Sequence, residues 1–256
     1  MKQRLVIKVG TNVLTNDHES LDMGVIAQIV SQIAELKKND YDIILVSSGA
    51  VGAGKELYTV NSNDEIQQRQ VYSSIGQARL MGIYADLFGK HGIICAQVLA
   101  TKDDFMGKEH YKNMKNCFDG LLSNGIIPIV NENDVVSLKE LMFTDNDELA
   151  GLTAFMAEVK TLILLSNIDG VFTGNPSDEH TELITEIPFG DTSFEQYIQT
   201  NTSSGGRGGM QSKFDTAKRL SEKGITVYIA NGKQPTVILD IMSGKQVGTK
   251  FIATSS

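Results

Sequence analysis

Short apolar runs alternate along the chain with longer segments in which apolar residues recur every three or four positions. The apolar runs predict strands near residues 4–9, 42–47, 93–98, 126–130, 161–166 and 225–230. The periodic segments predict helices near residues 22–38, 64–89, 108–123, 147–157 and 210–223. Strands and helices that alternate in this way are typical of βαβ units on a parallel sheet. The pattern therefore predicts an α/β fold, a three-layer αβα sandwich with a mainly parallel central sheet.

Residues 171–209 interrupt this alternation. They are rich in Gly, Ser, Thr and Asn, and their one apolar run is Leu183–Ile187. We expect small strands and loops in this segment. No Pro/Ser-rich linker or low-complexity tract divides the 256 residues, so one domain covering 1–256 is expected.

Composition and charge argue against several classes of protein. The net charge of -8 argues against nucleic-acid binding, because affinity for the phosphate backbone needs clustered Lys and Arg. The longest apolar runs are strand-sized, and Lys8 interrupts the first of them, so neither a membrane span nor an export signal is predicted. We expect a cytoplasmic protein. Cys95 and Cys117 fit no metal-ligand spacing, and we expect both to be buried, reduced thiols.

Two clusters of carboxylates and amides mark a candidate site. Asn131–Asp134 follows the strand predicted at 126–130, and Asp145–Asp147 precedes the helix predicted at 147–157. The carboxyl ends of parallel strands and the N-termini of helices are where open α/β sheets bind ligands. Helix capping could explain one residue of the second cluster, but the two clusters together indicate function rather than solvated loops.

Glycine accompanies charged or hydroxyl residues at four predicted strand exits, in Lys8–Asn12, Ser47–Lys55, Ser166–Gly170 and Ser203–Lys213. The second loop matches the phosphate-binding pattern G-x-x-x-x-G-K, but Glu56 stands where that pattern needs a Mg²⁺-binding hydroxyl. It therefore predicts an anion or carbonyl site with Ser48 as the side-chain contact. The third loop could serve a nucleotide or only turn the chain. The fourth favours a lid over a linker, because a basic residue, Lys213, follows it.

Two lysines are candidates for charge neutralisation. Lys8 lies inside a strand expected to be buried on both faces, which is a poor place for a solvated surface charge. Phosphoryl transfer depends on positioning and on neutralising the negative charge that spreads over the transferring group. We expect Lys8 and Lys213 to approach that group from opposite sides.

Taken in order, these motifs resemble the glutamate 5-kinases of the amino acid kinase family, over essentially the whole chain. The resemblance rests on Lys8–Thr11, Val46–Val51, Ile129–Asp134, Asp145–Asp147 and Gly208–Lys213. Members that phosphorylate N-acetylglutamate, aspartate or UMP usually carry Gly-Gly where this chain has Gly10-Thr11. The resemblance implies transfer of the γ-phosphoryl group of ATP to the side-chain carboxylate of L-glutamate, the first step toward proline, with Mg²⁺ bridging the phosphates.

The resemblance also implies a role for each site residue. Ser48, Asp134 and Asn146 would bind glutamate, with Asp134 pairing its ammonium group. Lys8, Lys213 and Asp147 would be catalytic, with Asp147 orienting the two lysines. ATP would be bound by Lys8, Ser166, Asn167, Arg207, Gly208, Gly209, Met210, Gln211, Ser212 and Lys213. No protein general base is required, because the attacking carboxylate is already ionised at neutral pH.

Three departures from the family pattern stand out. Thr144 replaces a glycine, Asn167 replaces a frequent aspartate, and the chain stops soon after Phe251, where many relatives continue into a PUA domain. The kinase domain alone is therefore expected. The resemblance further implies self-association through residues 64–89, feedback inhibition by proline around residues 132–147, and coupling to glutamyl phosphate reductase. Sedimentation tests the first, and unaltered kinetics in millimolar proline would contradict the second.

Two alternatives remain open. One is another small-carboxylate kinase of the same fold, which a substrate panel distinguishes. The other is a non-catalytic amino-acid sensor. A pure sensor has no need of Lys8 inside a strand or of Lys213 after a glycine-rich loop, and calorimetry showing amino-acid binding without nucleotide binding would favour it.

Overall fold

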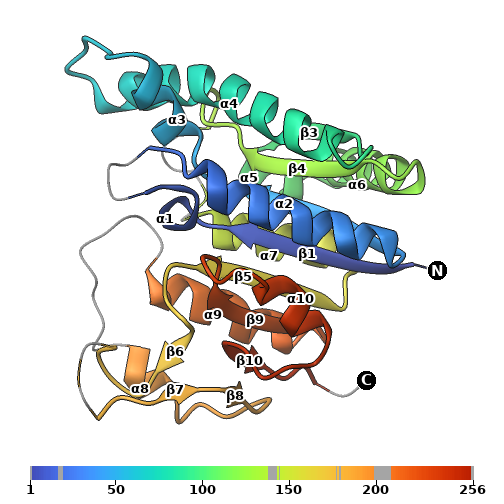
Figure 1. The fold of residues 1–256 in the computed structure, drawn as a ribbon, viewed down its shortest axis with the longest axis vertical. Coiled ribbons are helices and arrows are strands. Elements are labelled where there is room, and N and C mark those ends of the chain that lie inside the picture. Colours follow the sequence, from blue (N-terminus) through green and yellow to red (C-terminus); the bar gives the residue numbers. More distant parts are fainter. Residues whose placement is uncertain are drawn as a thin grey trace.

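The computed structural model describes residues 2–16, 20–137, 143, 145–176, 178, 180–198 and 209–254. Its main sheet has the strand order β3-β4-β2-β1-β5-β9-β10-β8 (Figure 1). These strands are β1 Gln3–Val9, β2 Tyr41–Ser47, β3 Cys95–Ala100, β4 Ile127–Glu132, β5 Thr161–Ser166, β8 Glu186–Ile187, β9 Thr226–Asn231 and β10 Thr249–Phe251. Every recorded pair in this sheet is parallel except β9 with β10. The predicted sandwich with a mainly parallel sheet is confirmed.

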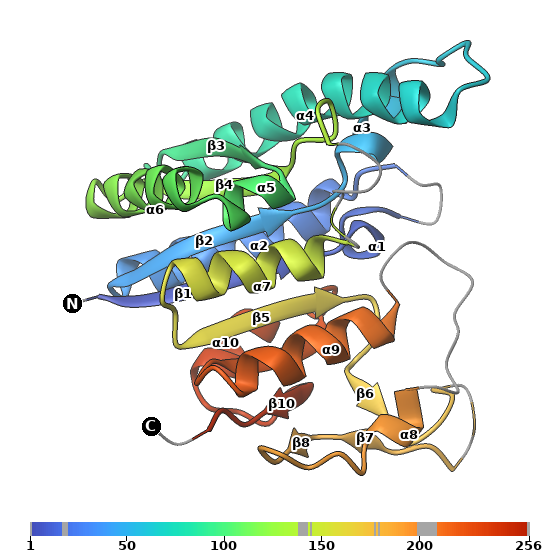
Figure 2. The same cartoon turned by 180° about the vertical axis from the view of Figure 1, so that it is seen from behind.

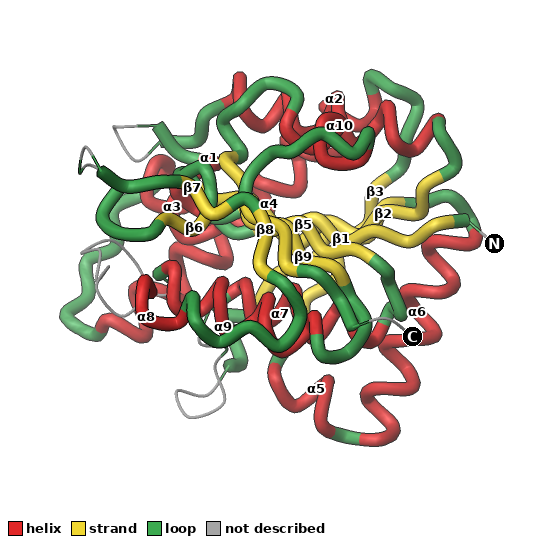
Figure 3. The backbone as a smooth tube through the Cα atoms, turned by 90° about the horizontal axis from the view of Figure 1, so that it is seen from below, coloured by secondary structure: helices red, strands yellow, loops and turns green. Residues whose placement is uncertain are grey.

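Helices cover both faces of the sheet (Figure 3). One face carries α2 (Met23–Lys38), α4 (Glu65–Gly89) and α10 (Val237–Met242), and the other carries α6 (Lys108–Ser123), α7 (Asn146–Met156) and α9 (Met210–Ser221). Alternate residues of β1 supply the two cores: Ile7 packs with the first group and Val6 with the second. Both side chains are fully buried, which is why the parallel strands read as continuous apolar runs.

Strand β1 is the centre of the architecture. It pairs in parallel with β2 on one side and with β5 on the other, so the chain continues toward opposite edges of the sheet from this point. Connections that diverge from neighbouring strands leave a crevice beyond the strands' carboxyl ends. Lys8 lies near the carboxyl end of β1, directly below that crevice.

Helix α3 (Ala50–Leu57) leaves β2 through a turn that requires glycine, because Gly49 has a φ of 101°. Figure 2 shows α3 beside α4, and the helices touch backbone to backbone. A Cβ added at Gly76 would lie 1.7 Å from the carbonyl oxygen of Ala50. This close contact holds the start of α3 over the carboxyl end of β2.

The remaining described elements are short. They are α1 (Thr11–Leu14), α5 (Lys102–Met106), α8 (Glu195–Ile198) and the antiparallel pair β6 (Val171–Phe172) and β7 (Leu183–Ile184). Small strands in 171–209 were expected, and β8 extends the main sheet through β10. None of the helices in the described part of the chain combines the length and apolar character needed to cross a lipid bilayer.

The six predicted strands and five predicted helices are confirmed to within two residues at every end. The predicted burial of the two cysteines was wrong. Cys117 is exposed on α6, although burial was expected, and Cys95 is only partly buried; both are free thiols. Strand β4 continues through Glu132, so Asn131 and Glu132 are its last residues and not part of the loop that follows.

Candidate active site

A cavity of about 630 Å³ opens beyond the carboxyl ends of β1, β2, β4 and β5. Its lining includes seven of the residues singled out from the sequence: Lys8, Ser48, Asp134, Asn146, Ser166, Asn167 and Lys213. Six secondary-structure elements and their exits contribute these side chains: β1, β2, β4, β5, α7 and α9. The structure therefore brings both sequence clusters and three of the glycine loops to one place.

Two lysines meet one carboxylate at the end of the cavity nearest β5. Lys8 Nζ lies 2.6 Å from Asp147 Oδ1, and Lys213 Nζ lies 2.9 Å from Asp147 Oδ2. The residues are 4%, 8% and 0% exposed for Lys8, Lys213 and Asp147. They come from β1, the first turn of α9 and the first turn of α7, so two helix N-termini and the central strand converge here.

The electrostatics of Asp147 follow from its neighbours. Burial alone would raise the pKa of its carboxyl, but the charges of Lys8 and Lys213 and their hydrogen bonds lower it below its ordinary value. Asp145 behaves differently, because burial and then the charge of Asp147 raise its pKa. Its carboxylate accepts hydrogen bonds from the backbone N–H groups of Asp147 and Glu148 and so caps α7.

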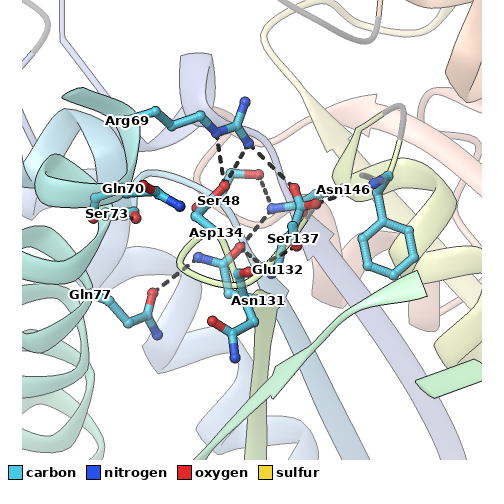
Figure 4. Close-up of polar contacts among 12 residues, drawn as sticks. Ser48, Arg69, Gln70, Ser73, Gln77, Asn131, Glu132, Asp134, Ser137 and Asn146 are labelled. Atoms are coloured by element: carbon cyan, nitrogen blue, oxygen red, sulfur yellow. Dashed lines mark hydrogen bonds and ion pairs between the residues drawn. The ribbon is translucent and has the colours of Figure 1, made fainter. Parts of the chain in front are cut away.

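A chain of amide hydrogen bonds crosses the other end of the cavity (Figure 4). Asn131 Nδ2 donates to Gln77 Oε1 at 3.0 Å, so the carbonyl oxygen of Asn131 faces Asn146. Asn146 Nδ2 then donates both to Asn131 Oδ1 at 2.9 Å and to Ser48 Oγ at 2.8 Å. With both of its N–H groups used, Asn146 offers a ligand its carbonyl oxygen, and Ser48 can offer its hydroxyl proton.

Arg69, on the second turn of α4, closes this end of the cavity. Its Nε donates to Asp134 Oδ1 at 2.8 Å, and its Nη2 lies 2.7 Å from the same oxygen and 3.3 Å from Glu132 Oε2. The two carboxylates are well buried, with side chains 6% exposed for Glu132 and 7% for Asp134, whereas the side chain of Arg69 is 32% exposed. One guanidinium therefore faces two buried carboxylates.

The pKa of Glu132 is raised, first by burial and then by the charge of Asp134. The backbone N–H of Phe143, which donates to Glu132 Oε1 at 3.2 Å, and the charge of Arg69 offset part of this rise. Glu132 thus anchors Phe143 beside the cavity and contributes negative charge near Asp134.

Only some of the residues predicted to bind ATP are among the described residues. Ser166 is buried and Asn167 exposed at the exit of β5, and both line the cavity. Of residues 209–213, Lys213 lines the cavity, while the exposed side chain of Gln211 donates to Asp215 and Met210 packs on the core. Gly209 is the N-cap of α9, and Ser212 lies in its first turn. Arg207, Gly208 and Thr144 lie outside the described residues.

Three of the four carboxylate oxygens of Asp145 and Asp147 have a partner, whereas Asp145 Oδ2 is buried without a hydrogen-bond partner among the described residues. Asp147 is held by two ammonium groups and Asp145 by backbone N–H groups. Within the described ranges, no group of three or more His, Cys, Asp or Glu residues is placed to hold a metal ion. These donors fit a Mg²⁺ ion that arrives on nucleotide phosphates better than one caged by the protein.

Comparison with known proteins assigns the chain to a family. The model of the amino acid kinase family matches residues 3–231. A protein of Bacteroides thetaiotaomicron named "Glutamate 5-kinase" is 48% identical over 261 residues, covering 100% of this chain and 72% of that protein. The chain belongs to the amino acid kinase family, among the glutamate 5-kinases.

Other members agree with this placement. The glutamate 5-kinase of Chlorobaculum tepidum is 48% identical over 98% of this chain and 69% of its own length. That of Clostridium perfringens is 36% identical over 98% of this chain and 96% of its own length. Among solved structures, a carbamate kinase from Giardia lamblia bound to AMP-PNP superposes with a TM-score of 0.73, covering 99% of both chains at 16% identity. At that identity the likeness concerns the fold alone.

The sequence pointed to most of the residues that line the cavity but missed Arg69. It also missed Gln77, which is not in the lining but holds Asn131 by a hydrogen bond. Both lie on α4, whose polar residues are spread around the helix. A long helix with one apolar stripe does not reveal which polar side chains face a cavity and which face water. The sequence did contain one indication of Arg69. The carboxylates at the end of β4 were expected to be buried, and buried carboxylates need a cationic partner.

Proposed function

We propose that the protein transfers the γ-phosphoryl group of ATP to the side-chain carboxylate of L-glutamate and forms L-glutamyl 5-phosphate, the first step of proline biosynthesis. The observation that carries the proposal is the opposite charge at the two ends of one cavity. Lys8 and Lys213 lie at one end, and Asp134 and Glu132 lie at the other. This polarity matches a substrate that has an ammonium group at one end and a carboxylate at the other.

The acceptor end would bind the amino-acid head group. Asp134 pairs with the ammonium group, and the carbonyl oxygen of Asn146 accepts a hydrogen bond from it. The hydroxyl of Ser48 donates to a substrate carboxylate. The N-terminus of α3, where Gly49 provides no side-chain cap, adds backbone N–H donors that favour an anion. The side-chain carboxylate then extends toward the lysines.

At the other end, an oxygen of the side-chain carboxylate attacks the γ-phosphorus of ATP in line with the departing oxygen. The new carboxyl–phosphate bond forms as the bond to the β-phosphate oxygen breaks, and ADP leaves with that electron pair. Lys8 and Lys213 neutralise the charge on the transferring group, while Asp147 holds both in place. Mg²⁺ bound to the phosphates supplies further neutralisation. No proton is transferred, so no general base is needed.

Ser166, Asn167 and the segment from Arg207 to Lys213 are proposed to bind ATP. Self-association through residues 64–89, proline inhibition around 132–147 and coupling to glutamyl phosphate reductase stay predictions. They follow from family membership and not from any contact described above.

Trapping the acyl phosphate with hydroxylamine tests the proposal. Purified protein with ATP, Mg²⁺, glutamate and hydroxylamine should form glutamyl hydroxamate, and omission of glutamate should abolish the product. Reaction with another carboxylate but not with glutamate would favour the alternative kinase. Binding of an amino acid without any nucleotide binding or turnover would favour the sensor.

A further inference from the structure

Arg69 is the basic residue of the acceptor end. Within the described ranges, it is the one basic side chain paired with Asp134 or Glu132. It reaches them from α4, more than sixty positions earlier in the chain. Lys8 and Lys213 lie at the opposite end with Asp147. The acceptor end therefore presents a buried negative charge and a positive charge side by side.

The guanidinium is only partly used by these contacts. Its Nε and Nη2 face the two carboxylates, whereas no described residue accepts a hydrogen bond from Nη1. Figure 4 shows one nitrogen of Arg69 directed away from the dashed contacts. Arg69 lines the cavity and keeps about a third of its side chain exposed. Its two remaining N–H donors are thus available to a ligand, and arginine favours planar, two-oxygen acceptors.

We propose that Arg69 binds the α-carboxylate of the amino-acid substrate and is a specificity-determining residue. The inference rests on the proposed function and deepens it. In the free protein, Arg69 and Asp134 neutralise each other; with substrate bound, the ammonium group lies against Asp134 and the α-carboxylate lies against Arg69. The two charges of the head group thereby take over part of the Arg69–Asp134 ion pair. Each buried charge of the protein and each charge of the substrate then has a partner of opposite sign.

This assignment has a consequence for substrate choice. A dicarboxylate that lacks the α-ammonium group leaves Asp134 without its ligand. An amino acid whose α-carboxylate is amidated leaves Arg69 without its ligand. A site built to bind a polar group rejects analogues that lack the group, because its own buried polar groups then go unpaired. The cavity should therefore select the whole head group and not only the reactive side-chain carboxylate.

A purely structural role for Arg69 makes a different prediction. If Arg69 only neutralised Glu132 and Asp134, its removal would weaken the binding of every substrate alike. If it binds the α-carboxylate, its removal should weaken substrates that carry this group more than substrates that lack it. A cycle that combines a protein variant with a substrate change separates the two roles.

The experiment compares kcat/KM for glutamate with that for glutamate α-amide, in which a neutral carboxamide replaces only the α-carboxylate. Wild type, Arg69→Met and Arg69→Lys are measured, and Arg79→Met serves as a matched control. Arg79 lies on the same helix and pairs with Glu56 instead of the acceptor-end carboxylates. Wild type should prefer glutamate roughly 10- to 100-fold, the range expected for a hydrogen bond to a charged group.

Arg69→Met should reduce this preference by lowering the value for glutamate more than the value for the amide. Arg69→Lys should keep more of the preference than Arg69→Met, and Arg79→Met should keep all of it. An equal loss for both substrates in Arg69→Met, or equal use of both by wild type, would overturn the inference. If Arg69→Met does not fold, the comparison of Arg69→Lys with wild type tests the role of Arg69. If wild type turned over neither compound, the proposed function would fail, and calorimetric binding of the same two compounds would still test Arg69.

Discussion

Asp147 places a single carboxylate between two ammonium groups, one from the central strand β1 and one from the first turn of α9. Three buried charges in contact are costly unless they satisfy one another, and removing one partner leaves another uncompensated. Glu132 and Asp134 show the inverse arrangement, with two carboxylates facing one guanidinium. The end with the two lysines therefore carries a net positive charge, and the end with the two carboxylates carries a net negative charge. Each end can bind a ligand group of the opposite sign.

The raised pKa of Glu132 predicts a pH-dependent contribution to stability. Its folded-state pKa lies above its ordinary value of 4.5, so between these values the native state binds more protons than the unfolded state. The contribution of this carboxyl to stability must then fall as pH rises through that window. The unfolding free energy of wild type minus that of Glu132→Gln, measured with urea, should decrease as pH rises above 4.5.

Glu109→Gln, at an exposed position of α6, controls for loss of a surface charge and should show no such trend. A wild-type advantage over Glu132→Gln that stayed constant or grew with pH would contradict the assigned shift.

Among the elements, α3 shows how packing can override local sequence preference. Its eight residues include two glycines, which disfavour a helix, and the sequence indicated a glycine loop that binds an anion or a carbonyl group there. The helix forms because Gly54 and Gly76 let α3 and α4 touch through their backbones. The strands, by contrast, were predictable from local sequence. A strand that is buried on both faces consists of consecutive apolar residues, and such a run is easily recognised. Elements of three or four residues, such as α1 and β10, leave no periodic pattern to find.

Two glycines of α4 give a matched test of this packing. Gly76→Ala would drive a methyl group into the carbonyl of Ala50 and should cost at least about 1–3 kcal/mol of stability. It should also raise KM for glutamate, because α3 carries the turn beside Ser48. Gly82→Ala meets nothing within 4 Å and should be neutral or stabilise by up to about 1 kcal/mol. Thermal unfolding and kinetics check both variants, and equal effects would contradict the packing account.

On the scale of the whole molecule, the chain continues from β1 toward opposite edges of the sheet, and this creates the crevice. Polar residues at the carboxyl ends of the strands line it. The order of elements made this crevice predictable, because ligands bind beyond the carboxyl ends at such a point. Asp134, Asn146 and Ser48 were accessible to sequence reasoning since each follows a strand or begins a helix. Arg69, which lines the cavity, and Gln77, which holds Asn131, were not, because both project from the side of a long helix and meet partners more than fifty residues away.

The account depends on Lys8 and Lys213 acting together on the transferring phosphoryl group, and kcat for Lys8→Met and Lys213→Met measures this most directly. Each should lose about 2 to 4 kcal/mol of transition-state stabilisation, roughly 30- to 1000-fold in kcat, with little change in KM for glutamate. Lys37→Met breaks a partly buried pair with Asp42, outside the cavity lining, and should leave kcat unchanged. An unchanged kcat in a folded Lys8→Met or Lys213→Met protein would contradict the account.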